Sequence, residues 1–133
     1  MHALISDLKD ILALVEKANG TGEGDLSVCV QALSSGIETL SSATEIVLKA
    51  SDEHALSVAT PYLTLCGHIV SGALLMKSVA NGLVASDPHA NSMATLARYH
   101  AVSIMPQAAA QLDLIRTGTS AIFDFPVDQL ADL

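Results

Sequence analysis

The chain has 133 residues, a length that suits one domain, 1–133, with a core that needs no disulfide or metal staples. Half of the residues are hydrophobic but only 3% are aromatic and none is Trp, so the core must consist of Ala, Leu, Val and Ile, as in close-packed helices. Fourteen acidic residues against six Lys and Arg give a formal net charge of −8, which argues against nucleic acid and anionic membrane surfaces as partners.

The cysteines and the N-terminal residues predict a cytoplasmic protein. Cys29 and Cys66 are too few for a disulfide framework, and both fall inside helical patterns where a buried thiol is ordinary. Charged residues from Asp7 onward interrupt the first twenty residues, so these contain no apolar core of a signal peptide. We therefore expect a reducing compartment and no export.

Two N-terminal segments have apolar residues at alternating spacings of four and three, which predicts amphipathic helices. The first runs from Leu4 to Ala18 and stops at Asn19-Gly20. Residues 19–24 form a polar, glycine-rich loop that is too short to separate domains. The second helix is predicted from Leu26 to Ala50, and only Thr44 breaks its apolar stripe.

A third helix begins at Ser51-Asp52, where a capping side chain is followed by acidic residues that favour a helix N-terminus. Pro61 leaves two alternatives open. A second helix beginning beside this proline would make 52–59 a separate short helix, whereas one long helix would be kinked at Pro61. We expect the kinked helix, because the apolar stripe continues in register from Ala59 to Leu63.

The segment from Pro61 to Ala85 is apolar on two adjacent helical stripes, which implies packed neighbours on at least two sides. Its interior glycines, Gly67 and Gly72, each cost about 1 kcal/mol of helix propensity relative to Ala. Close approach of another helix would offset that cost, so we expect Gly67→Leu to destabilise the fold. A membrane span is the alternative for so apolar a segment, but His68 and Lys77 interrupt it, and we expect no membrane partner.

A fourth helix begins near residue 88, because Asp87-Pro88 combines a capping carboxylate with a proline suited to the first turn. Pro106 should bend this helix, with 107–115 helical beyond the bend and a stop at Gly118. The complete pattern predicts an all-α fold, an up-and-down four-helix bundle with kinked third and fourth helices.

Catalytic and metal-binding patterns are missing from the sequence. No Glu is followed by His three residues later, as di-iron bundles require, and the five histidines are scattered singly. No serine lies in a nucleophile-elbow sequence, and the glycines fit neither a P-loop nor a dinucleotide-binding pattern. We therefore predict no catalytic, cofactor-binding or metal-binding residue in this chain.

His68 suggests one further alternative, a histidine phosphotransfer domain, because such domains are acidic helical bundles with one reactive histidine on a helix. Gly72 matches the small residue of that family four positions on, but Ser71 stands where those domains usually have Lys. The apolar surroundings also disfavour a phosphorylated side chain. A buried, hydrogen-bonded core histidine is the expected role of His68.

Several short motifs together resemble one family. They are Pro61-Tyr62-Leu63-x-Leu65-x-Gly67-His68, Leu96-Ala97-Arg98-Tyr99, Ile104-Met105-Pro106-Gln107-Ala108 and Thr117-Gly118. Their order and spacing resemble the C-terminal helical domain of bacterial acyl-CoA dehydrogenases of the methylthiopropanoyl-CoA dehydrogenase type, as far as residues 127–130. The chain departs from that pattern at residues 73–75, where an aromatic is common, and at residues 91–93, where a Lys is common.

The resemblance implies an accessory, non-catalytic domain that packs on a flavoenzyme body or mediates oligomerisation, with FAD bound by the other domains. The alternatives are a free-standing, self-associating interaction module and phosphotransfer through His68. A homo-oligomer is expected because a helix apolar on two faces in so small a bundle leaves apolar surface outside. The residues predicted to serve in packing or at an interface are Tyr62, Leu63, Gly67, Val70, Gly72 and Pro106.

Overall fold

The computed structural model describes residues 2–20, 25–117 and 126–132, and these form helices without a strand. The elements are α1 (His2–Asn19), α2 (Ser27–Lys49), α3 (Asp52–Ser57), α4 (Ala59–Val84), α5 (Ala90–Ser103), α6 (Gln107–Thr117) and a 3₁₀ helix, η1 (Val127–Asp132). The all-α prediction is confirmed. The glycine stop predicted at Gly118 and the loop residues 21–24 lie outside the described residues.

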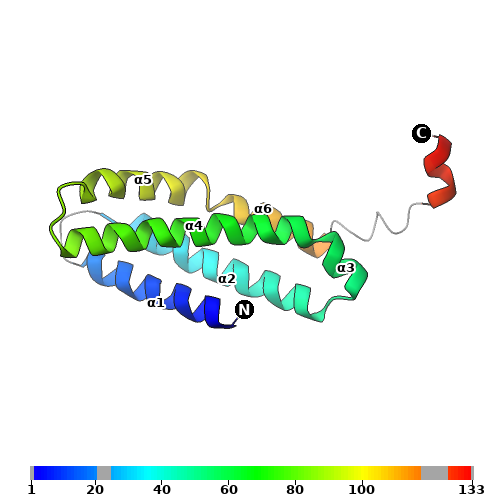
Figure 1. Ribbon diagram of the computed structural model, residues 1–133, viewed down its shortest axis with the longest axis horizontal. Helices are drawn as coiled ribbons and strands as arrows, with labels where there is room; N and C mark the ends of the chain where they lie inside the picture. Colours follow the sequence, from blue (N-terminus) through cyan, green and yellow to red (C-terminus); the bar gives the residue numbers. More distant parts are fainter. Residues whose placement is uncertain (1, 21–24, 118–125, 133) are drawn as a thin grey trace.

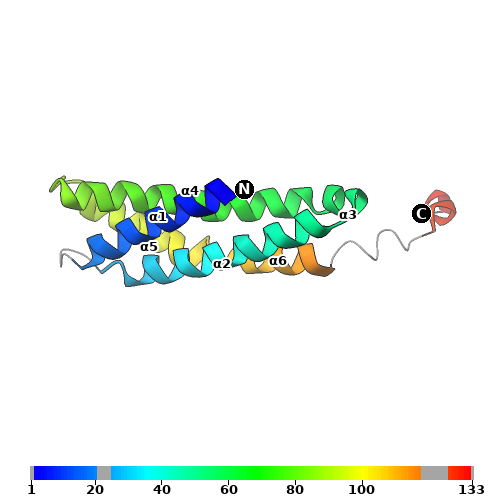
Figure 2. The same ribbon diagram turned by 90° about the horizontal axis from the view of Figure 1, so that it is seen from below.

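Helix α4 is the central element, because it contacts α1, α2, α3, α5 and α6. Figure 1 shows α5 and α6 following one another along α4, with α1 and α2 below it, and Figure 2 shows α2 beside α6. By length and composition α4 could also cross a membrane, a test that the core helix of a soluble protein passes as well. Its buried side chains, which include Leu65, Ile69 and Met76, place one side of α4 in the core.

The apolar stripes predicted for the first two helices form the core together with α4. Leu8, Val15 and Ala18 of α1 are buried, and so are most stripe residues of α2. Thr44, the polar residue in the α2 stripe, is buried as well, and its Oγ1 lies 3.0 Å from the hydroxyl oxygen of Tyr62 on α4. This hydrogen bond gives each hydroxyl group a partner, which reduces the desolvation penalty of the polar position.

The kink predicted at Pro61 is not confirmed, because the helix stops and restarts. Helix α3 ends at Ser57 and α4 begins at Ala59, with Val58 between them at φ −101° and ψ 5°. A continuous helix would require a backbone N–H at Pro61, and the proline ring would clash with the carbonyl group of Ser57, four residues earlier. In the first turn of α4 the missing N–H costs nothing.

The bend predicted at Pro106 is likewise a break between two helices. Helix α5 ends at Ser103, and α6 begins at Gln107, where the bent helix was expected to continue. The side-chain amide of Gln107 donates to the carbonyl oxygen of Ser103 at 2.9 Å and so caps the end of α5. The backbone N–H groups of Ile104 and Met105 both donate to the carbonyl oxygen of His100, and the second of these bonds closes a wider, π-type turn at the end of α5.

The turn between α4 and α5 reverses the chain at Ser86, whose φ of 56° is unusual for a residue with a side chain. The N–H of Asp87 donates to the carbonyl oxygen of Gly82, and that of Ser86 donates to that of Leu83, the pattern of a Schellman C-cap. The Asp87 carboxylate accepts from the N–H of His89, and α5 begins at Ala90. The helix start predicted near residue 88 is therefore two residues early.

Candidate functional site

The sequence-predicted interface residues do not gather in one place. Gly72 is buried, Tyr62 and Val70 are half-buried, and Leu63, Gly67 and Pro106 are exposed. Pro106 borders a shallow groove of about 400 Å³ between α2 and the α5–α6 break, which is lined largely by small residues such as Ala32, Ser35 and Gly36.

Gly72 marks the closest approach between α4 and its neighbours. A Cβ atom at this position would lie 2.8 Å from Sδ of Met105 and 2.9 Å from Cε1 and Nδ1 of His100. Glycine is therefore required for the α5–α6 break to pack onto α4.

Gly67 behaves in the opposite way, because no atom of residues 2–20, 25–117 or 126–132 outside its own helical backbone and chain neighbours lies within 4 Å of the position that its Cβ would occupy. The expectation that Gly67→Leu would overpack a helix contact in this fold is therefore wrong. The helical spacing of apolar residues places both glycines on α4. It does not show which of the two apolar stripes of this helix faces the core.

A small polar cluster joins α4 to α5 beside Gly72. The Ser71 Oγ atom lies 3.0 Å from Nε2 of His100 and 2.6 Å from the carbonyl oxygen of Gly67. His68, one turn earlier on α4, is half-buried, and its charge acts on His100. His68 is thus only partly buried, whereas a buried core histidine was expected. In this cluster the enclosed polar atom belongs to His100.

The geometry of this cluster does not favour nucleophilic catalysis. The Ser71 hydroxyl group donates to the Gly67 carbonyl oxygen, so Nε2 of His100 is assigned as the donor to Ser71 Oγ. Nδ1 of His100 is buried without a hydrogen-bond partner in the described part of the chain. An activated serine requires the opposite proton arrangement and an acceptor at Nδ1 that stabilises the imidazolium.

The environment of His100 predicts an acid-sensitive fold. Burial lowers the pKa of His100, and the charge of His68 lowers the pKa further. An imidazole in the unfolded chain binds a proton near pH 6.5, whereas His100 in the folded protein, with its lowered pKa, binds a proton only at a lower pH. The free energy of unfolding should therefore be fully retained above about pH 6.5, fall as the pH drops through this value, and level off below the folded pKa.

Urea unfolding at pH 7.5 and at pH 5.5 measures this loss. His100→Gln removes the titrating group and should flatten the dependence over this window, while His89→Gln, at an exposed turn position, should leave it unchanged. A wild-type stability that is equal at the two pH values would contradict the prediction.

Metal binding finds no support among the described residues, which contain no group of three or more His, Cys, Asp or Glu side chains able to hold an ion. The two thiols are also separate: Cys29 is buried on α2, and Cys66 is half-buried on α4 beside Tyr62. Burial raises the pKa of both thiols, which disfavours the reactive thiolate.

The outer side of α4 and α5 carries apolar side chains that the fold leaves in solvent. Leu63 and Leu74 on α4 are 68% and 54% exposed, and Leu96 and Tyr99 on α5 are 55% and 63% exposed. We call these four residues together with Gly67 the outer face. Sequence reasoning named only Leu63 and Gly67 of this set. The α5 residues were missed because their exposure depends on the antiparallel register of α4 and α5.

Comparison with known proteins identifies one family. The family model described as acetyl-CoA dehydrogenase C-terminal like matches residues 4–126, from the first turn of α1 to the residue before η1. Searches of curated proteins and of solved structures gave no match.

Proposed function

Because the chain belongs to the acetyl-CoA dehydrogenase C-terminal-like family, we propose that it acts as an accessory, non-catalytic helical domain that packs against an acyl-CoA dehydrogenase body. The observation that carries this proposal is the family match over nearly the whole helical body. The quoted motifs favour the methylthiopropanoyl-CoA dehydrogenase type within this family. In this proposal FAD and the acyl-CoA thioester are bound by the body, and the protein works in the cytoplasm.

The residues of the chain support a non-catalytic role. Removing a proton beside a thioester needs a placed carboxylate base, and hydride transfer needs a flavin held against the same carbon. The carboxylates of α1 that the structure describes, Asp7, Asp10 and Glu16, are all exposed, as solvated surface acids are. A flavin pyrophosphate would also approach a chain of net charge −8.

The isolated chain should therefore neither bind FAD nor oxidise an acyl-CoA. Calorimetric titration with FAD and with short- and long-chain acyl-CoA thioesters should give no heat of binding, and a dye-reduction assay should give no turnover. Flavin binding at micromolar concentration would show that this chain holds the cofactor. Turnover that disappears when acidic residues of the chain are substituted would show that this chain carries the catalytic base.

Docking on the body is tested separately. The chain is mixed with a dehydrogenase body of this family from which the C-terminal helical domain has been removed, and complex formation is followed by size-exclusion chromatography with light scattering. Co-elution at equal stoichiometry supports the proposal, and separate elution at about 50 μM, a concentration at which accessory interfaces of ordinary size assemble, contradicts it.

Phosphotransfer through His68 has weaker support. The half-buried imidazole lies on the side of α4 that carries the Ser71–His100 contact, where a doubly charged phosphate would have to enter the helix interface. No radiolabel should pass from a phosphorylated receiver to the chain, and label that disappears in His68→Gln would reverse this assignment.

A further inference from the structure

We propose that the outer face of α4 and α5 is a self-complementary surface that binds the same surface of a second copy of this chain, with Gly67 at the helix contact. The inference goes beyond the proposed function, because pairing of two copies requires no dehydrogenase body.

The first argument is that the outer face is one continuous surface across two helices. Helices α4 and α5 are antiparallel, and their register is set by the Ser71–His100 contact at one end and by the approach of Ala90 to Gly82 at the other. In this register Leu74 and Leu96 lie at nearly the same level. Leu74 of α4 and Leu96 of α5 are therefore neighbours across the two helices, and Gly67 and Leu63 continue the apolar surface along α4 past the level at which α5 ends.

The second argument concerns Gly67. A glycine in the interior of a helix costs about 1 kcal/mol relative to Ala, and none of the residues that the structure describes requires it, since the Cβ position is open among them. Leu63 and Leu74 lie four residues before and seven residues after Gly67, on the same side of α4. An open glycine between two exposed leucines is the arrangement that lets a helix of another molecule approach the backbone closely.

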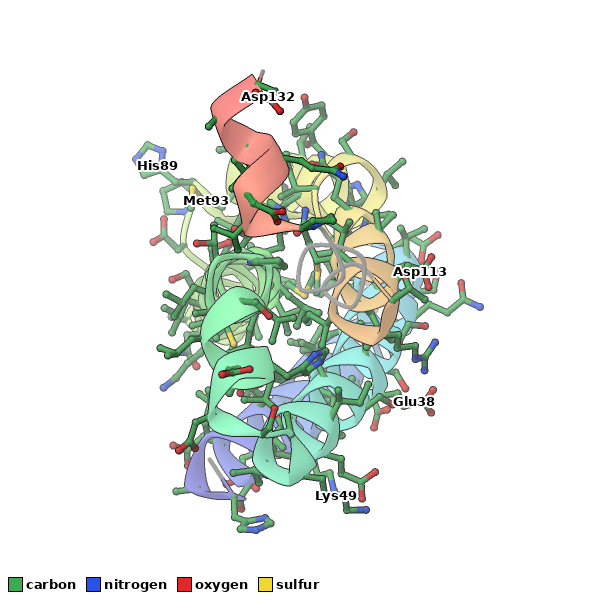
Figure 3. All side chains as sticks on the ribbon, turned by 90° about the vertical axis from the view of Figure 1, so that its right-hand side faces the viewer. Glu38, Lys49, His89, Met93, Asp113 and Asp132 are labelled. Carbon is green, nitrogen blue, oxygen red and sulfur yellow. The ribbon has the colours of Figure 1, made fainter. Side chains whose placement is uncertain are left out.

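The third argument is the distribution of charge, and it identifies a second copy as the occupant. Of the fourteen acidic residues, one, Asp87, lies between Ala59 and Ser103, in the turn that connects α4 and α5. Figure 3 looks along the helices and shows the labelled acids Glu38 of α2 and Asp113 of α6 on a different side from Met93 of α5. The same range contains two basic residues: Lys77 borders the same groove as Asp7 and Asp10 of α1, and Arg98 donates to the carbonyl oxygen of Asp25. The α4–α5 side is therefore poor in acids, unlike the rest of the molecule.

A surface for an oppositely charged partner would carry charge of its own. In a two-fold symmetric contact each residue near the axis meets its own copy, so any charge there would face a like charge. The outer face, whose five residues are all uncharged, satisfies this condition, whereas the α1 and α2 sides, with their exposed carboxylates, would repel a second copy.

The size of the surface suits a dimer that dissociates on dilution. At 1.5 Å per residue and a width of about 10 Å per helix, the outer sides of α4 and α5 together present roughly 600 Å². A standard stable interface buries about 800 Å² on each partner, so the expected contact is somewhat smaller than standard.

The test is sedimentation equilibrium of the full 133-residue chain between about 1 and 200 μM, a concentration range that brackets the dissociation constant of a weak interface. A monomer–dimer equilibrium is expected for the wild-type chain. A monomer throughout the range, or association that continues beyond a dimer, overturns the proposal.

Three variants locate the surface. Gly67→Leu should raise the dimer dissociation constant at least tenfold without lowering the melting temperature of the monomer, a combination that misfolding does not produce. Leu74→Arg should act in the same direction. Leu48→Arg is the matched control, because Leu48 is also exposed, at 69% against 54% for Leu74, but lies at the end of α2, and it should leave the dissociation constant within twofold. Dimerisation that survives Gly67→Leu and Leu74→Arg overturns the assignment of the surface.

Salt dependence separates self-pairing from binding driven by opposite charges. Raising NaCl from about 50 to 500 mM screens the mutual repulsion of two chains of net charge −8, so the dimer should become tighter or stay unchanged. Weakening of the dimer by salt would indicate a contact between unlike charges and would overturn the proposal. Because no dehydrogenase body is present in these experiments, their result is independent of the docking test.

Discussion

Replacing Ile69 by Ala should lower the free energy of unfolding by about 2–5 kcal/mol, the range for emptying a buried aliphatic site. Ile69 is fully buried in the middle of α4. Its Cγ1 atom would lie 3.3 Å from a Cβ atom at Gly36, so α2 already passes close to it. Two helices held this close by the surrounding core leave the cavity little room to collapse.

Urea unfolding at a few micromolar protein, where the monomer dominates, measures this loss. Leu74→Ala is the control in the same helix, because Leu74 is half in solvent, and its effect should stay below about 0.5 kcal/mol. Similar losses for the two substitutions would mean that α4 is not oriented as described.

Gly72→Leu should destabilise the protein by at least about 1–3 kcal/mol, the cost of forcing extra atoms into a packed contact. The new side chain would meet Sδ of Met105 and the ring of His100 at under 3 Å. Met105 is buried and His100 is held by Ser71, so relief requires α5 and α6 to move away from α4.

Gly67→Leu provides the matched comparison, because it is the same substitution five residues earlier on the same helix. Its side chain enters open space, and the gain in helix propensity should raise monomer stability by up to about 1 kcal/mol. Thermal unfolding of the two variants should therefore shift in opposite directions. A shift in the same direction would show that the environments of the two glycines are not distinct.

The spacing of apolar residues was sufficient to predict the helices that bury a single apolar stripe. The predicted first and second helices match α1 and α2 to within two residues, because each pairs one apolar stripe with one polar side. The helical segment from Gln107 was expected for a local reason as well, since a proline disturbs the preceding helix, although a bend was predicted there and the structure has a break. These outcomes depend on residues close together in the chain.

The orientation of α4 could not be obtained in this way. Both of its stripes are apolar, and the structure buries Leu65 and Met76 of one stripe but exposes Leu63 and Val84 of the other. The choice depends on where α1 and α6 pack, which is set by contacts between distant segments. The pairing of Ser71 with His100, 29 residues apart, has the same origin and leaves no signal in the local sequence.

The break before α4 was mispredicted because two local effects compete there. The continuing apolar stripe favours one helix through Ala59, whereas the missing N–H of Pro61 favours a new start. Ser51 caps α3 by accepting from the N–H of His54, and six residues suffice for that helix because α4 restarts at once. The missing N–H of Pro61 outweighed the continuous apolar stripe, and a new helix begins.

The hydrogen bond between Tyr62 and Thr44 gives the protein a natural optical probe of its core. The chain has two Tyr and no Trp, so its near-ultraviolet absorption comes chiefly from these two rings. Burial raises the pKa of Tyr62, and its bonded hydroxyl group should report the packing of α2 on α4 through a shifted absorption band. Tyr99, on the exposed side of α5, reports on a different event, the covering of that surface by another molecule. Tyr99→Phe leaves a single chromophore that follows folding, and Tyr62→Phe leaves one that follows association, without any added label.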